Sequence, residues 1–248
     1  RTPVGYAVTA AGAGAATGAW SATGAVSVTS SGSTITLNDD ITTGGTTKDL
    51  TINANGALSF ASNADALTAS GVLAVTASGA TSGAATLTST GNMAMTLGDK
   101  WTATSGTLAL ASGGTLSLNG KLESATAGDV TLAVTGTCTF ADAKTLTSAG
   151  AATVSCVSTT AVGYTISAAG AVQVTGAWTG SGALSVTSSG STVALNDDIT
   201  TTGGSSIGVT CNSGALTLAD TKTMASAGTT TLSAQSISSV AYTVSSVG

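Results

Sequence analysis

The chain contains no histidine, one arginine (Arg1) and one proline (Pro3). Without histidine it cannot build a Ser-His-Asp or Cys-His nucleophile, and a zinc site would lack its usual imidazole ligands. Six lysine and arginine residues against eleven acidic residues give a net charge of −5. Nucleic-acid binding needs a basic surface, which this balance does not provide. We therefore expect a protein that is not an enzyme and has no nucleic-acid partner.

Charged residues make up only 7% of the chain and aromatic residues 3%, and no run of 18 apolar residues occurs. The missing run excludes a membrane-spanning helix. Low charge alone would fit disorder, but 42% hydrophobic residues argue for a folded core. The chain is rich in Thr and Val, which favour strands, and in Gly, Asn and Asp, which favour turns. The composition predicts an all-β fold.

A long internal repeat organises the sequence. Residues 18–42 (GAWSATGAVSVTSSGSTITLNDDIT) return as residues 176–200 (GAWTGSGALSVTSSGSTVALNDDIT), with 19 of 25 positions identical at an offset of 158. The motif of residues 4–12 returns at 162–170 and 240–248, so the period is about 79 residues. We expect one solenoid over residues 1–248. Its pseudo-repeats are 12–91, 91–170 and 170–248, with 1–12 equivalent to the end of a preceding repeat.

A shorter period of about 22 residues runs inside each repeat. Its apolar residues alternate with polar ones, which predicts strands that bury one face. A single coil cannot bury that face, so neighbouring coils must stack on it. We therefore expect a β-solenoid, similar to a parallel β-helix, of roughly 11 or 12 coils, which at about 4.8 Å per coil gives a rod near 55 Å long.

Glycines that close each coil mark its length. Three of the steps between them are well short of a full coil: Gly12 to Gly24, Gly91 to Gly106 and Gly170 to Gly182. Two explanations are open. Either half-coils occur at these points, or the marker glycine moves to a different edge of the solenoid.

Charged residues fall in the corners that follow the second strand of a coil. Counted from the marker residues, they occupy one predicted column: Asp40, Asp65, Lys100, Lys121, Lys144, Asp198 and Lys222. Exposed pairs with neighbouring acids contribute at most about 1 kcal/mol each. Backbone ladders and side-chain stacking must therefore hold the rod together.

The most site-like string is Asn-Asp-Asp at residues 38–40, repeated at 196–198. Adjacent carboxylates suit calcium or acid-base chemistry, so Asp39, Asp40, Asp197 and Asp198 are weak calcium candidates. Asn and Asp at a corner are also ordinary turn residues. Because the string recurs with the repeat, we interpret it as turn chemistry and predict no cofactor.

Three cysteines, Cys138, Cys156 and Cys211, leave an odd number. In the repeat alignment Cys138 matches Leu116 and Leu216, and Cys156 matches Ala234. We therefore expect buried thiols that act as small apolar residues. A disulfide or a link between subunits is the alternative.

Threonine pairs of the form Thr-x-Thr raise a further possibility. They occur at Thr34/Thr36, Thr86/Thr88, Thr145/Thr147 and Thr229/Thr231. A flat threonine face that orders water, as in ice-binding solenoids, needs the pair at the same place in every coil. The pairs change strand along this sequence, so we interpret them as outward β-formers.

The two ends of the sequence carry equivalent motifs. VAYTVSSVG, the last nine residues, matches residues 4–12, so the end of one rod can continue at the start of another. We expect head-to-tail or lateral self-association, with an interface formed by six residues: Val4, Tyr6, Val8, Val240, Tyr242 and Val244. The alternative is an excerpt of a longer repeat protein, in which the ends carry no such meaning.

Two segments resemble the repeats of large microbial cell-surface β-solenoids: GALSVTSSGSTVALNDDITTTGG (182–204) and GALTLADTKTMASAG (214–228). The resemblance is to filamentous-haemagglutinin and autotransporter-passenger adhesins and to the repeat proteins of extracellular sheaths and fibres. It implies a secreted protein at or beyond the cell surface. We expect a structural subunit of an extracellular filament, sheath or surface layer; the alternative is the shaft of an adhesin.

Overall fold

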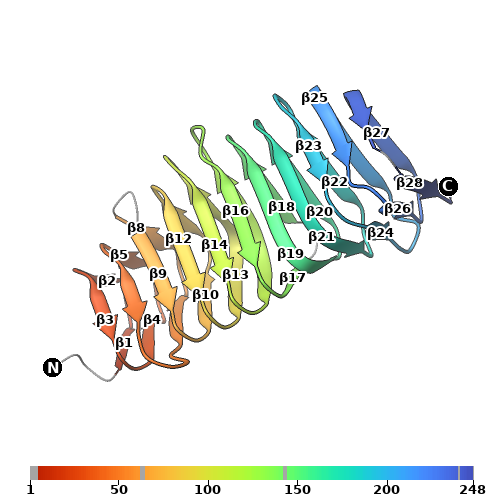
Figure 1. The fold of residues 1–248 in the computed structure, drawn as a ribbon. Helices are drawn as coiled ribbons and strands as arrows, with labels where there is room; N and C mark the ends of the chain where they lie inside the picture. The colour runs from red at the N-terminus through yellow and green to blue at the C-terminus, as the bar shows by residue number, and fades with distance from the viewer. Residues whose placement is uncertain (1–4, 62–64, 142–143, 240, 248) are drawn as a thin grey trace.

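The computed structural model describes residues 5–61, 65–141, 144–239 and 241–247. Over these residues the fold is all-β, and parallel strands stack into a β-solenoid of about 11 turns (Figure 1). This confirms the predicted fold class. None of the described segments forms a helix of the length and apolarity that crossing a membrane requires.

The strand pairings run in three independent series, so each coil has three faces. Six long strands (β13, β15, β19, β21, β25 and β27) turn a corner and belong to two faces.

Face 1 comprises β1 (Tyr6–Ala10), β4 (Val26–Ser30), β7 (Leu50–Ala54), β10 (Leu73–Ala77), the starts of β13 (Met93–Ala103) and β15 (Leu116–Ser124), β17 (Thr137–Phe140), the ends of β19 (Ala152–Ala161) and β21 (Val172–Gly180), β24 (Ile199–Thr201), β26 (Thr223–Ser226) and β28 (Thr243–Ser246). Face 2 comprises β2 (Gly14–Ala16), β5 (Ile35–Leu37), β8 (Leu58–Phe60), β11 (Ala80–Ser82), the ends of β13 and β15, β18 (Lys144–Ser148), β20 (Tyr164–Ala168), β22 (Leu184–Ser188) and the starts of β25 (Ile207–Leu218) and β27 (Thr230–Ser238). Face 3 comprises β3 (Trp20–Ala22), β6 (Ile41–Thr43), β9 (Asp65–Ala69), β12 (Ala85–Ser89), β14 (Leu108–Ser112), β16 (Val130–Val134), the starts of β19 and β21, β23 (Val193–Leu195) and the ends of β25 and β27.

Inward side chains stack in ladders along each face. On face 3, Leu87, Leu110 and Leu132 lie in register on successive coils, each no more than 1% exposed. Each fully buried leucine contributes about 1.5–3 kcal/mol of hydrophobic stabilisation. The apolar interior is one continuous cluster along the rod, as the alternating sequence pattern predicts.

The long repeat does not return to the same face. Val244 lies eleven turns above Tyr6 on face 1, and three repeats separate the two motifs, so one repeat spans about three and two-thirds turns. Trp20 consequently belongs to face 3, Trp101 to face 2 and Trp178 to face 1. Each repeat is rotated by one face, and three repeats bring the pattern back to its starting face.

This rotation explains the short glycine steps. Gly12 follows β1, at the edge between faces 1 and 2, whereas Gly24 precedes β4, at the edge between faces 3 and 1. The step between them therefore covers two of the three faces of a coil. The marker glycine moves to a different edge at each repeat, and the half-coil explanation is wrong. Stacked corner glycines are needed because a Cβ on Gly128 would strike the carbonyl of Gly106 in the turn below.

The charged residues also change edge with the repeat, so the prediction of a single charged column is wrong. Asp40 lies between β5 and β6, at the edge of faces 2 and 3. Lys100 and Lys121 lie at the edge of faces 1 and 2, where they are in register. Asp198 and Lys222 lie at the edge of faces 3 and 1. The sequence shows that a charge is at a corner, but only the strand register shows which of three corners it occupies.

Candidate functional site

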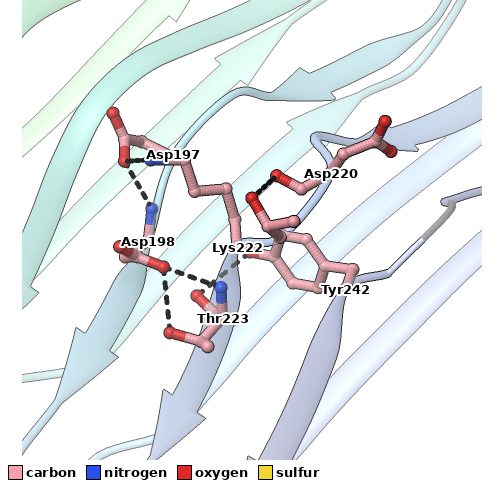
Figure 2. Close-up of polar contacts among 7 residues, drawn as sticks. Asp197, Asp198, Asp220, Lys222, Thr223 and Tyr242 are labelled. Atoms are coloured by element: carbon pink, nitrogen blue, oxygen red, sulfur yellow. Dashed lines mark hydrogen bonds and ion pairs between the residues drawn. The ribbon is translucent and has the colours of Figure 1, made fainter.

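The repeated Asn-Asp-Asp corners have the same geometry in both copies. Asp197 Oδ1 accepts the N–H of Asp198 at 3.0 Å, which closes the turn between β23 and β24. Asp198 Oδ1 accepts the N–H and the hydroxyl of Thr223, in the coil above, at 2.7 and 3.0 Å (Figure 2). In the first repeat, Asp40 accepts the N–H of Ala66 at 2.7 Å in the same way. The second aspartate of each corner therefore binds the next turn of the rod.

The second Asn-Asp-Asp corner, residues 196–198, contains an ion pair. Lys222 Nζ lies 2.7 Å from Asp197 Oδ1 (Figure 2). The hydrogen bond from Lys222 holds the pKa of Asp197 below its ordinary value, and the same bond raises the pKa of Lys222. Tyr242 donates its hydroxyl to the Thr223 carbonyl at 3.3 Å. Partial burial, with the nearby charges of Asp198 and Asp197, raises the pKa of Tyr242 to about 12.

The weak calcium candidates form two separate pairs. Asp39 and Asp40 lie at the edge of faces 2 and 3, whereas Asp197 and Asp198 lie at the edge of faces 3 and 1. Nowhere in the described part of the chain do three or more His, Cys, Asp or Glu side chains gather as metal ligands. The bonds that these carboxylates make to backbone N–H groups favour the turn interpretation.

Further carboxylates, which the sequence did not single out, bridge successive turns. Asp49 Oδ1 accepts the N–H of Val72 at 2.8 Å, and Asp129 Oδ1 accepts the N–H of Ala151 at 2.7 Å. Each of these aspartates directly precedes a strand, which is the signal that could have identified them.

Inward hydroxyls at the strand ends form a second set that sequence reasoning missed. Ser112 Oγ lies 2.9 Å from the carbonyl oxygen of Gly91 in the turn below and 3.1 Å from that of Thr115 in its own corner. Ser148 Oγ makes the same two contacts, to Gly128 and Ala151. The signal is a serine that ends a strand one or two residues before a corner glycine, as Ser112 and Ser148 do. Each of these carbonyls also accepts a backbone N–H from a neighbouring turn, so the serine hydroxyl is its second donor and adds a bond between the corner and the turn below.

The cysteines occupy two kinds of position. Cys138 and Cys156 form a buried disulfide with a Cα–Cα distance of 6.0 Å, so the expectation of three free thiols is wrong for this pair. Cys211 is a buried free thiol, as predicted. It lies in register above Ser188, and its Sγ contacts the Ser191 carbonyl at 2.8 Å as a corner serine would.

Four of the six predicted interface residues are described, whereas Val4 and Val240 lie outside the described residues. Tyr6 lies on β1, where its ring is 5.6 Å from that of Trp20. Val8 and Val244 are 41% and 43% exposed. Strands β1 and β28 both belong to face 1, so the predicted residues lie on the same face at opposite ends of the described rod (Figure 1).

Comparisons of the chain with protein-family models, with curated proteins and with solved structures find no match.

Proposed function

We propose that the chain is a non-enzymatic structural subunit of an extracellular filament, sheath or surface layer, which self-associates by stacking solenoid coils. The observation that carries this proposal is the pair of open ladder edges at β1 and β28, on the same face eleven turns apart. Val8 and Val244 are about two-fifths exposed there, and Ile237 in the adjoining β27 is 50% exposed. Strands of a second copy would cover these residues and continue the backbone ladders.

The strand count suggests how two copies meet. Within the described residues face 1 has twelve strands, β1 to β28, whereas faces 2 and 3 have eleven each. Two copies therefore form an uninterrupted stack if β28 of one copy takes the place of β1 in the next. The match between residues 240–248 and residues 4–12 supports this exchange, because both segments carry the same alternation.

The Cys138–Cys156 disulfide supports secretion. Disulfides persist in extracellular and periplasmic compartments and are rare in reducing cytosol.

The shaft of a surface adhesin is the second candidate. The observation that supports a shaft is that corner side chains bind within the rod. The carboxylates of four aspartates each accept a backbone N–H of the next turn: Asp40, Asp49, Asp129 and Asp198. Such a rod serves to hold another region at a distance. The two candidates differ in assembly, because a subunit associates with itself and a shaft does not.

The test compares two double variants at β28. Tyr242→Lys with Val244→Lys places charge on the predicted contact, and Thr243→Lys with Ser245→Lys places the same charge on the outward side of the same strand. We expect the first pair to prevent filament formation in electron micrographs and the second to leave it intact. Unaltered filaments with the first pair would contradict end-to-end stacking, and short rods formed by the unmodified chain at high concentration would favour the shaft.

A further inference from the structure

Face 2 carries a row of outward hydroxyls, interrupted at one coil, along its second half. Thr145, Thr165, Ser185, Gly208 and Thr231 lie in register on five successive strands, β18, β20, β22, β25 and β27. Figure 1 shows β18, β20 and β22 side by side along the rod. Only Gly208 lacks a hydroxyl in this first row.

A second row lies two residues further along the same strands. It consists of Thr147, Ser167, Thr187, Thr210 and Ser233, which are in register on the same five coils. Parallel strands place successive members about 4.8 Å apart along the rod, and the two rows are separated by about 6.6 Å along each strand. We call these two rows the hydroxyl grid.

On these five coils nine of the ten positions carry a hydroxyl, so the pairs share one place on the face, although the sequence pattern had argued against a common position. Of the five grid pairs only Thr145/Thr147 reads Thr-x-Thr, because the other coils use Thr-x-Ser, Ser-x-Thr or Gly-x-Thr. Serine presents the same hydroxyl as threonine. The register of the strands, which the sequence does not give, aligns these pairs.

The grid's hydroxyls are free to bind something outside the chain. Within the described residues, none of its nine hydroxyls has a protein hydrogen-bond partner. Inward hydroxyls on the same strands differ: Ser148 and Ser188 each bond a backbone carbonyl at 2.7 Å. The hydrogen-bonding capacity of the grid thus points entirely outward.

The grid is also uncharged, and it is bounded by charge below. Glu123, in register below Thr147, forms an ion pair of 2.6 Å with Lys100. Above that pair no outward position of the two rows carries a charge. A charged ligand therefore has no partner on the grid.

Physical arguments select the ligand class. A covering protein sheet would bury nine hydroxyls against backbone groups that its own ladders already use, and burying a hydroxyl without a partner is unfavourable. A sugar chain would need an exposed aromatic ring to stack on, but Tyr164 and Trp178 in this section are each 2% exposed. Water can satisfy every hydroxyl, and a rigid grid holds it in a regular array. We propose that the hydroxyl grid binds the surface of ice.

The experiment measures thermal hysteresis and incorporation of the purified chain into growing ice. The unmodified chain should show both. Thr165→Lys with Ser185→Lys, which are in register inside the grid, should abolish both. Thr131→Lys with Thr153→Lys, in register on face 3, is the matched control and should retain both.

A second pair of variants tests the proposal if the lysine variants do not fold. Thr165→Tyr keeps strand propensity but makes the grid uneven, and Thr153→Tyr does the same on face 3. Circular dichroism checks that each is folded, and only Thr165→Tyr should lose activity. The proposal is overturned if the unmodified chain neither shows hysteresis nor enters ice, if variants of both faces lose activity equally, or if the chain binds insoluble cellulose or chitin but not ice.

Discussion

At the scale of single residues, corner side chains act between turns as well as within one. Asp198 binds the backbone of the coil above, and Ser112 contacts a carbonyl oxygen of the coil below. A chain with 33 glycines and few large side chains needs such bonds, because small residues bury little apolar area. Substitutions that remove these contacts one at a time measure what each contributes.

Asp198→Ala should lower the free energy of unfolding by about 1 kcal/mol, because the Thr223 N–H loses its acceptor. Asp198→Asn should lower it less, since an amide oxygen can accept the same bond. Urea unfolding of both variants, with and without calcium, measures this. If calcium raises the stability of the unmodified chain and Asp198→Asn abolishes that effect, the turn interpretation is wrong.

Ser112→Ala should cost about 1 kcal/mol, since the Gly91 and Thr115 carbonyls lose the hydroxyl as a second donor and keep only a backbone N–H. Ser112→Cys should cost less, because Cys211 already occupies the equivalent position on face 2. Ser117→Ala, on the outward side of β15, is the control and should have little effect. A loss for Ser112→Ala no larger than that for Ser117→Ala in denaturant unfolding would mean that the Ser112 hydrogen bond is unimportant.

The Asp197–Lys222 pair should make stability depend on pH at both extremes. The pKa of Asp197 is lowered in the fold, so its contribution is present above its unfolded-state pKa and is lost as pH falls through the folded value. The pKa of Lys222 is raised, so its contribution is present below 10.5 and is lost as pH rises through the folded value. Lys222→Met should therefore be less stable than the unmodified chain near neutral pH, and the difference should vanish in strong acid and strong alkali. A difference that is constant with pH in urea titrations would exclude the ion pair as its cause.

At the scale of strands and corners, the sequence predicts elements better than their positions around the rod. Alternation identifies strands such as β12, where Ala85, Leu87 and Ser89 are buried. It does not tell which face a strand belongs to, because the long repeat spans a fractional number of turns. The prediction of one charged column failed for this reason, and the common register of the hydroxyl pairs on face 2 could not be read from the sequence either.

The disulfide was difficult to predict for a related reason. Cys138 and Cys156 are 18 residues apart, which is less than one coil, so they do not lie in register. Cys138 faces inward on β17 on face 1, whereas Cys156 lies inside the corner where β19 passes from face 3 to face 1. The two sulfur atoms are bonded across that corner, inside the core.

The double variant Cys138→Ala with Cys156→Ser should lower stability by about 3 kcal/mol, as expected for a closed loop of this size. Cys211→Ser is the control and should leave stability nearly unchanged, because Ser188 fills the equivalent position one coil below. Thermal unfolding with and without reductant measures both. Reductant should lower the unfolding temperature of the unmodified chain and leave that of the double variant unchanged. If the disulfide of the unmodified chain is fully reduced and its unfolding temperature does not fall, the disulfide does not stabilise the fold.

At the scale of the whole molecule, three rotated repeats make a rod whose first and last described strands share face 1. The proposed function requires copies of this rod to stack end to end, with β28 of one copy in the place of β1 in the next.

Diffraction and image averaging of filaments grown from the purified chain show whether the copies stack in this way. End-to-end stacking predicts a spacing of about 4.8 Å along the filament axis and a subunit repeat of about 53 Å, the height of eleven turns. A 4.8 Å spacing perpendicular to the axis, or isolated short rods at every concentration, would contradict it.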